Sequence, residues 1–290
     1  MEPEYNEIQM LKDNPGKYYL SLKNLEKQKC ELETKITLKD IYDPVFEKKP
    51  KKIKFNIPLL DLLLEGGLDV GEFIQFYGDV NVGKTQLMLQ LALNCQLSFD
   101  INSQKVVIFV TLEKSFPSKR IKRLKDFLKN TTKNSKKLTF NIISLEFNTL
   151  YAFVNDLIPI IDQFKDKVIL VIFDMVDSIQ REDSEGRTCF KCFSMLSKLA
   201  REYKFAVAMT KGLLDMSDIK SLKLNWNARI TKRVFISNTE ANINLNLDEY
   251  EDGIDMRIRK MKVIENSNFC YFVVTPTGIE SVIKKRQKFP

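Results

Sequence analysis

The residues of this sequence best suited to chemistry are Gly78, Gly83, Lys84 and Thr85, which stand at the spacing G-x-x-x-x-G-K-[ST]. Two glycines at this spacing permit a tight loop whose backbone N–H groups point inward at a polyphosphate. Lys84 would reach the β- and γ-phosphates, and the hydroxyl of Thr85 would ligate Mg²⁺. The pattern therefore predicts a site for ATP and Mg²⁺. The residues predicted to contact the nucleotide are Gly78, Asp79, Val80, Asn81, Val82, Gly83, Lys84, Thr85 and Gln86.

Two carboxylates follow apolar runs that could bring them to the same loop. Asp174 comes directly after KVILVIF, residues 167–173, and Glu113 comes directly after KVVIFVTL, residues 105–112. Ligands of open α/β sheets bind at the carboxyl ends of the strands, so both acids are expected near the phosphates. We predict that Asp174 holds Mg²⁺ together with Thr85, and that Glu113 orients the attacking water.

A purely structural interpretation of these acids stays open at this point, since charged side chains often mark the end of a buried strand. Asp177, three residues after Asp174, is a lesser candidate for the metal role. The predicted catalytic residues are Glu113 and Lys84.

The elements that must position these groups alternate between buried strands and helices. Short continuous apolar runs predict strands over 73–77, 105–112, 140–145, 167–173 and 205–209. Helical periodicity predicts helices over 57–64, 85–97, 121–128, 150–164 and 193–203. Strands that alternate with helices form a parallel sheet with right-handed crossovers. Short alternating runs after Ile230 predict an antiparallel extension.

The domain organisation follows from the same patterns. Residues 1–52 are predicted to be a short helical segment and a basic linker, and residues 53–290 to be one α/β domain. The linker run EKKPKKIK, residues 47–54, has two interpretations, a nuclear-import signal or a solvated tether, and both stay open.

Composition excludes several classes of function. The 290 residues contain no histidine, so Ser-His-Asp and Cys-His catalysis are excluded. No apolar stretch approaches the roughly 18 residues that span a bilayer, and we expect no membrane association. Cys189 and Cys192 form a C-x-x-C, but without a second pair or any histidine a metal site there is disfavoured. The net charge of +8 permits nucleic-acid binding without requiring it.

Several linked segments resemble the RecA-type strand-exchange recombinases, and most of all the eukaryotic recombinase paralogues of homologous recombination. These segments are LLDLLLEGGLDVGEFIQFYG, GKTQLMLQLALNCQL, TLEKSFPSKRI, LVIFDMVDSIQRED and WNARITKRVFI. The resemblance covers roughly residues 57–280. It places Glu113 at the family's catalytic glutamate, and Phe116, Arg120 and Arg181 at matching positions.

The resemblance implies a RecA-like P-loop core, with a mostly parallel twisted sheet flanked by helices. It also implies a nuclear ATP-binding subunit that assists recombinase filaments on single-stranded DNA, with weak ATP hydrolysis that depends on DNA and on Mg²⁺. A second recombinase-family subunit is the expected protein partner. The residues expected to contact DNA are Lys211, Lys220, Lys223 and Arg229.

One departure from the family pattern favours a different class of function. Lys211 and Gly212 stand where the family carries Asn-Gln, whose glutamine senses the γ-phosphate. The alternative is therefore a structural adaptor subunit that does not hydrolyse ATP. A small-molecule kinase is a third possibility, but neither an arginine-rich lid nor a substrate pocket is recognisable, and the match around Glu113 would be unexplained.

Overall fold

A single nine-stranded sheet runs through the part of the chain that this computed structural model describes. The described residues are 52–97, 99, 104–112, 116–131, 140–146, 149, 152–177, 187–212, 229–239, 258–264 and 268–282. All of them belong to one compact unit, Pro50–Pro290, whereas the unit Met1–Lys49 lies outside them. The predicted division of the chain at residues 52 and 53 therefore stays a prediction.

The strand order is β3-β2-β4-β5-β1-β6-β7-β8-β9. The strands are β1 Phe73–Gly78, β2 Val106–Thr111, β3 Asn141–Glu146, β4 Val168–Asp174, β5 Ala206–Gly212, β6 Lys232–Asn238, β7 Arg259–Val263, β8 Phe269–Thr275 and β9 Gly278–Val282. The strands from β3 to β6 pair in parallel, and those from β6 to β9 pair antiparallel. This arrangement confirms the predicted mostly parallel sheet with an antiparallel extension.

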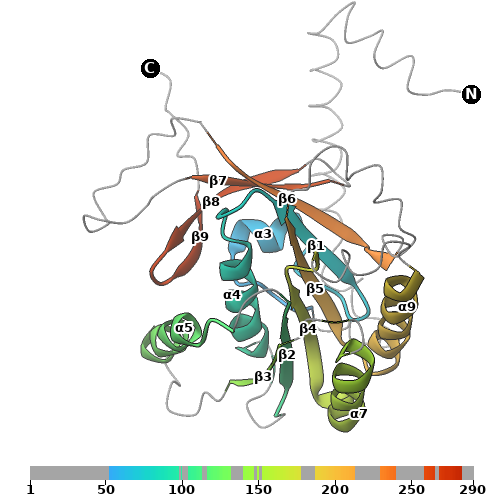
Figure 1. Ribbon diagram of the computed structural model, residues 1–290. Coiled ribbons are helices and arrows are strands. Elements are labelled where there is room, and N and C mark those ends of the chain that lie inside the picture. The colour runs from blue at the N-terminus through green and yellow to red at the C-terminus, as the bar shows by residue number, and fades with distance from the viewer. Residues whose placement is uncertain are drawn as a thin grey trace, which may run out of the picture. The chain divides into compact units, whose positions relative to one another are not determined.

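Helices pack on both faces of the sheet, most of them on its parallel part (Figure 1). They are α3 Pro58–Leu63, α4 Lys84–Leu97, α5 Ser118–Thr131, the π-helix η3 Phe153–Leu157, α7 Ile158–Phe164, the 3₁₀ helix η4 Lys165–Lys167 and α9 Arg187–Glu202. Side chains of α3, α4 and α5 share one buried cluster with one face of the sheet, and those of η3, α7 and α9 share the other. Because both faces are covered, β2 and β4 are buried at every position, which explains their continuous apolar sequences.

Two elements differ from expectation in ways that have local causes. The helix expected over 150–164 is a π turn followed by α7, and Pro159 at the junction has no N–H to continue regular α-helical bonding. Strand β6, expected in the antiparallel extension, pairs in parallel with β1. It starts at the edge where β1 starts, because Thr231 N donates to Phe73 O at 2.8 Å.

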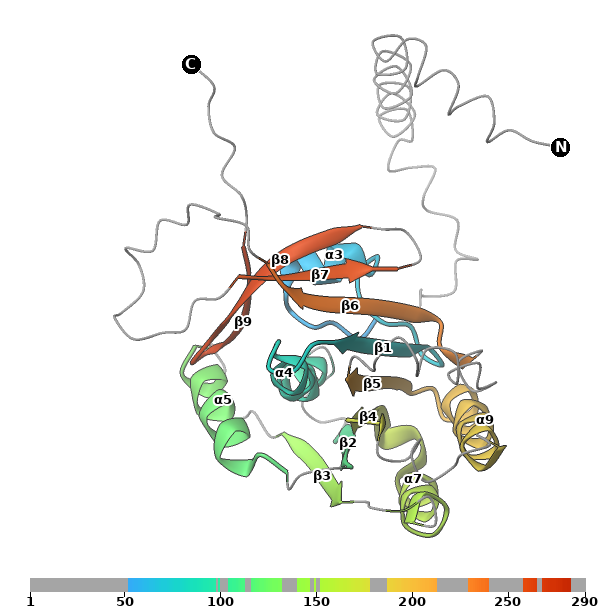
Figure 2. The same ribbon diagram turned by 45° about the horizontal axis from the view of Figure 1, so that its top comes forward.

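The central position of β1 determines where the glycine-rich loop lies. Strand β1 sits between β5 and β6, and all three point toward the start of α4 (Figure 2). At the end of β1, Gly78 has φ +153°, and a Cβ there would lie 1.9 Å from the carbonyl oxygen of Ile236 on β6. Only glycine permits this close approach, so the loop leaves the sheet directly against the backbone of β6.

Candidate nucleotide-binding site

The loop between β1 and α4 has the backbone conformation that its sequence predicts. Asn81 and Gly83 have positive φ angles of 63° and 95°, and asparagine and glycine are the residues that adopt such angles most readily. A Cβ on Gly83 would lie 2.9 Å from Val274 Cγ2 on β8, so the loop also packs tightly against the antiparallel extension. Loop and extension therefore form one continuous wall.

Lys84 lies inside this loop, where little solvent reaches its side chain. Its Nζ donates hydrogen bonds to the carbonyl oxygens of Gly78 at 2.8 Å and Asp79 at 2.5 Å. Burial lowers the pKa of Lys84, while the charges of Asp177, Asp174 and Asp79 act in the opposite direction. An ammonium group has three N–H donors, so one more remains for an anion held by the loop.

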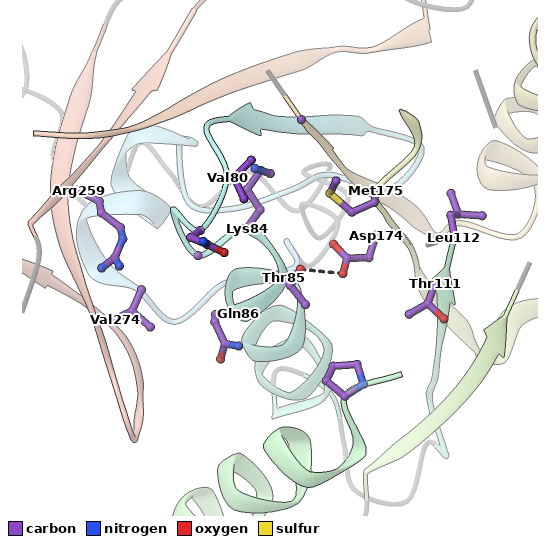
Figure 3. Close-up of a pocket in the computed structure, with 14 residues that line it drawn as sticks. Val80, Lys84, Thr85, Gln86, Thr111, Leu112, Asp174, Met175, Arg259 and Val274 are labelled. Carbon is purple, nitrogen blue, oxygen red and sulfur yellow. Dashed lines mark hydrogen bonds between the residues drawn. The ribbon is translucent and has the colours of Figure 1, made fainter. Parts of the chain in front are cut away.

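Thr85 and Asp174 meet at the carboxyl edge of the sheet, as their types and positions predict. Thr85 Oγ1 donates to Asp174 Oδ2 at 2.8 Å (Figure 3). Thr210 Oγ1 donates to Asp174 Oδ1 at 2.6 Å. The hydroxyl of Thr210 in turn accepts a hydrogen bond from Met175 N at 2.8 Å. The carboxylate is thus fixed by two hydroxyls, and it offers oxygen ligands of the kind that Mg²⁺ prefers.

The end of β5 is the part of the site that departs from the family pattern. Lys211 is only 6% exposed, and alternation along β5 turns its side chain toward the face that α7 and α9 cover. Gly212 lines the cavity with backbone alone, and its N–H donates to Asp177 Oδ2 at 2.7 Å. No side chain therefore reaches the cavity from the position where the family carries its glutamine.

These groups surround a cavity of about 390 Å³ (Figure 3). Its lining residues are Val80, Asn81, Gly83, Lys84, Thr85, Gln86, Thr111, Leu112, Pro117, Asp174, Met175, Gly212, Arg259 and Val274. Sequence reasoning missed Arg259 and Val274, which reach the cavity from β7 and β8. The alternation of β7 indicates that Arg259 shares a face with the buried Met261, but only the long-range strand order places that face at the loop.

The other predicted nucleotide contacts divide between the wall and the rim. Val82 is fully buried in the core, so its side chain stabilises the loop from behind. Val80 is 78% exposed at the rim of the cavity. Gln86 lines the cavity and accepts a hydrogen bond from Arg120 Nε at 2.6 Å.

Arg120 joins three elements around the site. Besides the bond to Gln86 on α4, its guanidinium donates to the carbonyl oxygens of Thr275 at 2.9 Å and Pro276 at 2.5 Å, at the end of β8. Burial lowers the pKa of Arg120, with the charge of Arg123 acting in the same direction. This bridge fixes α5, and with it Pro117, against the cavity.

The remaining predicted residues do not gather at this site. Glu113, Lys220 and Lys223 lie outside the described residues, so their roles stay predictions. Arg229 lies at the opposite edge of the sheet, two residues before Thr231 and near the start of β1. Cys189 and Cys192 belong to α9, and their side chains are buried in the core. No group of three or more metal-binding side chains occurs among the described residues. Within those same residues, no helix is both long and apolar enough to cross a bilayer.

Comparisons with known proteins agree on one family. The sequence model of the family described as Rad51 matches residues 52–280. The DNA repair protein RAD51 homolog 1 of Arabidopsis thaliana is 27% identical over 56% of the chain and 50% of its own length. The DNA repair and recombination protein RadA of Ignicoccus hospitalis is 27% identical over 58% of the chain and 55% of its own length. The chain therefore spans about half the length of these relatives.

Proposed function

Because the chain belongs to the Rad51 family, we propose that it acts in homologous-recombination DNA repair as an ATP-binding subunit that assists recombinase filaments on single-stranded DNA. The observation that carries this proposal is the cavity in which Lys84, Thr85 and Asp174 converge. The names of the relatives, which concern DNA repair and recombination, support the process in which we place the chain.

The residues of the cavity fit a nucleoside triphosphate with Mg²⁺. The loop N–H groups, the positive end of the α4 dipole and Lys84 would hold the phosphates. Thr85 and Asp174 would hold Mg²⁺, which offsets the negative charge on the phosphates when it is bound. Arg259, 7% exposed on the far wall, would add a second positive charge to the cavity.

We further propose slow ATP hydrolysis, with Glu113 orienting water and Lys84 stabilising the charge on the transferred phosphate. Glu113 follows directly after Thr111, the last residue of β2, and Leu112, and both of these residues line the cavity. The absence of a side chain at Gly212 supports slow turnover, because no side chain at that position can contact the γ-phosphate.

A second recombinase-family subunit would complete the site in the nucleus. Val80, 78% exposed at the rim of the cavity, is a side chain that such a subunit would cover. Lys211, Lys220, Lys223 and Arg229 remain the proposed DNA contacts. Of these, Lys211 would need a change at the end of β5 before it could reach DNA, since it is buried in the described structure.

The end of β5 also supports an alternative, a structural adaptor subunit that does not hydrolyse ATP. In this case a hydrogen bond from the backbone N–H of Gly212 to the carboxylate of Asp177 takes the place of a phosphate sensor. The two functions differ in what they require of Lys84. An adaptor would assemble with its partner normally after Lys84→Ala, whereas the active subunit would lose its function with its fold intact.

The deciding experiment measures Mg²⁺-ATP binding and ATP hydrolysis by the purified chain, with and without single-stranded DNA and a recombinase-family partner. Glu113→Gln serves as the matched control, since it keeps the shape of the side chain and removes its charge. Hydrolysis that rises with DNA and partner, and that is lost in Glu113→Gln, supports the active subunit. Binding without turnover, unchanged by Glu113→Gln, supports the adaptor.

A further inference from the structure

A second cleft lies at the edge of the sheet opposite to the nucleotide cavity. It encloses about 480 Å³, and its lining residues are Ser194, Ser197, Lys198, Arg201, Glu202 and Arg229. Five of them come from α9 at spacings of three and four residues, which places them on one face of the helix. Arg229 comes from the residues just before β6, whose start lies beside α9 (Figure 2).

The distance between the two sites follows from the sheet. Strand β1 leads from the edge near Arg229 to Gly78 at the nucleotide loop, and it is six residues long. At about 3.3 Å per residue, the two edges lie roughly 20 Å apart. The cleft is therefore separate from the nucleotide cavity, with which it shares no lining residue.

The side chains of the cleft are rich in hydrogen-bond donors. Lys198, Arg201 and Arg229 are cations and Glu202 is the only acid, which gives the lining a net charge of +2 (three positive, one negative). Arg201 is directed by Ser197, whose Oγ accepts from Arg201 Nη2 at 3.3 Å, a contact that uses one of five guanidinium N–H groups. Such a lining is suited to an anion with several acceptor oxygens.

Arg229 and Ser194 support this interpretation from within the described structure. Arg229 Nε and Ser194 Oγ are both shielded from solvent and have no hydrogen-bond partner among the described residues. The guanidinium of Arg229 also lies 5.9 Å from the ring centroid of Phe190 on α9, which ties it to the helix. Arg201 stands in the last turn of α9, where the helix dipole stabilises a positive charge. Arg229 lies outside α9, so the dipole does not account for the presence of its charge in the cleft.

We propose that this cleft binds backbone phosphates of single-stranded DNA, as a contact separate from the nucleotide site. The proposal rests on the DNA role proposed above and extends it to Lys198 and Arg201, which the sequence did not single out. Phosphate groups match the donors by charge and by number of oxygens, and the contact carries no base specificity. In this proposal Arg229 contacts DNA together with the α9 residues of the same cleft.

The test is the salt dependence of binding to a fluorescent single-stranded oligonucleotide between 50 and 200 mM salt. The cleft variant is Lys198→Ser with Arg201→Gln, and the control is Lys122→Ser with Lys129→Gln, two exposed cations of α5. The slope of log K against log salt is negative, and each lost phosphate contact reduces its magnitude by about 0.7. The magnitude should therefore fall by about 1.4 in the cleft variant and by far less in the control. Over this fourfold range of salt, the ratio of wild-type to variant affinity should then shrink about sevenfold. Arg229→Gln alone should reduce the magnitude of the slope by about 0.7.

The outcomes separate this proposal from the proposed function. If the wild type binds the oligonucleotide and the cleft variant keeps the slope of the control, the cleft proposal is overturned while the DNA role stands. If the wild type has no affinity for single-stranded DNA, the DNA role itself fails and the cleft proposal fails with it. Binding of a fluorescent ATP analogue, expected to be unchanged in the cleft variant, confirms that its fold is intact.

Discussion

The side chain of Gln90 on α4 holds the β8–β9 hairpin in place, and its removal should be costly. Gln90 Nε2 donates to Ile279 O at 3.1 Å, and Ile279 N donates to Gln90 Oε1 at 2.5 Å. Ile279 is 3% exposed, so Gln90→Ala would leave both of its backbone groups buried without partners. At about 1–3 kcal/mol for each such group, partly recovered by relaxation, we expect a loss of about 2–4 kcal/mol in the free energy of unfolding.

Gly278 provides a second way to break the same bridge. A Cβ there would lie 2.7 Å from Gln90 Oε1, so Gly278→Ala should push the amide away and add strain at φ +144°. If the bridge is responsible, the two changes should not be additive. Gly278→Ala should cost less by about 1–2 kcal/mol in a Gln90→Ala background than in the wild type.

Urea denaturation followed by circular dichroism measures these differences. Gln104→Ala, which truncates an exposed glutamine, is the matched control and should change stability by less than about 0.5 kcal/mol. For a domain of this size, the Gln90→Ala loss should also lower the melting temperature by about 4–16 °C. Strict additivity of Gln90→Ala and Gly278→Ala would refute the reasoning, because it would mean that Gly278 acts without touching the amide.

Three further outcomes are expected. Thr210→Val removes the hydroxyl between Asp174 and Met175 N. Binding of a fluorescent ATP analogue with Mg²⁺ should therefore weaken about tenfold or more, while binding without Mg²⁺ changes less. Equal loss with and without Mg²⁺ would contradict the proposed metal role of Asp174. Burial raises the pKa of Asp61 against the opposing effect of hydrogen bonds from backbone N–H groups such as that of Phe55. The folded state therefore binds this proton more tightly than the unfolded state, and the penalty for the ionised form is relieved as pH falls through the raised pKa. The stability advantage of Asp61→Asn over the wild type, measured by urea midpoints, should accordingly be largest at neutral pH and shrink in acid; an advantage that grew in acid would contradict this sign. Burial also raises the pKa of the Cys270 thiol to about 12. This thiol should therefore resist a disulfide reagent at pH 8 in the native chain and react once denaturant is added. Rapid reaction of Cys270 in the native chain would contradict this prediction.

Local patterns in the sequence were sufficient for most of the sheet and for the phosphate loop. Continuous apolar runs identified β1, β2, β4 and β5, because strands buried on both faces contain little else. The conformation of the loop is determined locally, because its glycines adopt positive φ angles and Lys84 donates to a carbonyl oxygen of the same loop. The proximity of Thr85 and Asp174 needed one inference beyond the local pattern, namely that parallel strands bring their carboxyl ends to one edge.

Residues whose role depends on non-local pairing could not be found in this way. Arg259 and Val274 reach the cavity only because β6 pairs with β1 and carries β7 and β8 beside it. The polar residues of α4 are a similar case. Gln90 and Asn94 are polar, yet Gln90 binds Ile279, and Asn94 Nδ2 donates to the carbonyl oxygen of Phe55 at 2.6 Å. Helix α4 is buried on nearly every side, and its amides hold neighbouring backbone that the sequence cannot locate.

The contacts of Gly212 show that the residues of the proposed nucleotide site are held in place without a side chain at the end of β5. Loop, Lys84 and the Thr85–Asp174 pair depend on β1, α4 and β4, none of which requires a particular side chain at the end of β5. Asp177 accepts the Gly212 N–H directly, which fixes that end of the strand by a contact independent of any bound phosphate. A ligand shifts a conformational equilibrium only through interactions that differ between the two states. Residue 212 has no side chain that could contact the γ-phosphate, so this residue has no side-chain contact through which ATP and its hydrolysis products could be distinguished. We therefore expect a nucleotide at the proposed site to stabilise the chain more than it changes the chain's affinity for DNA.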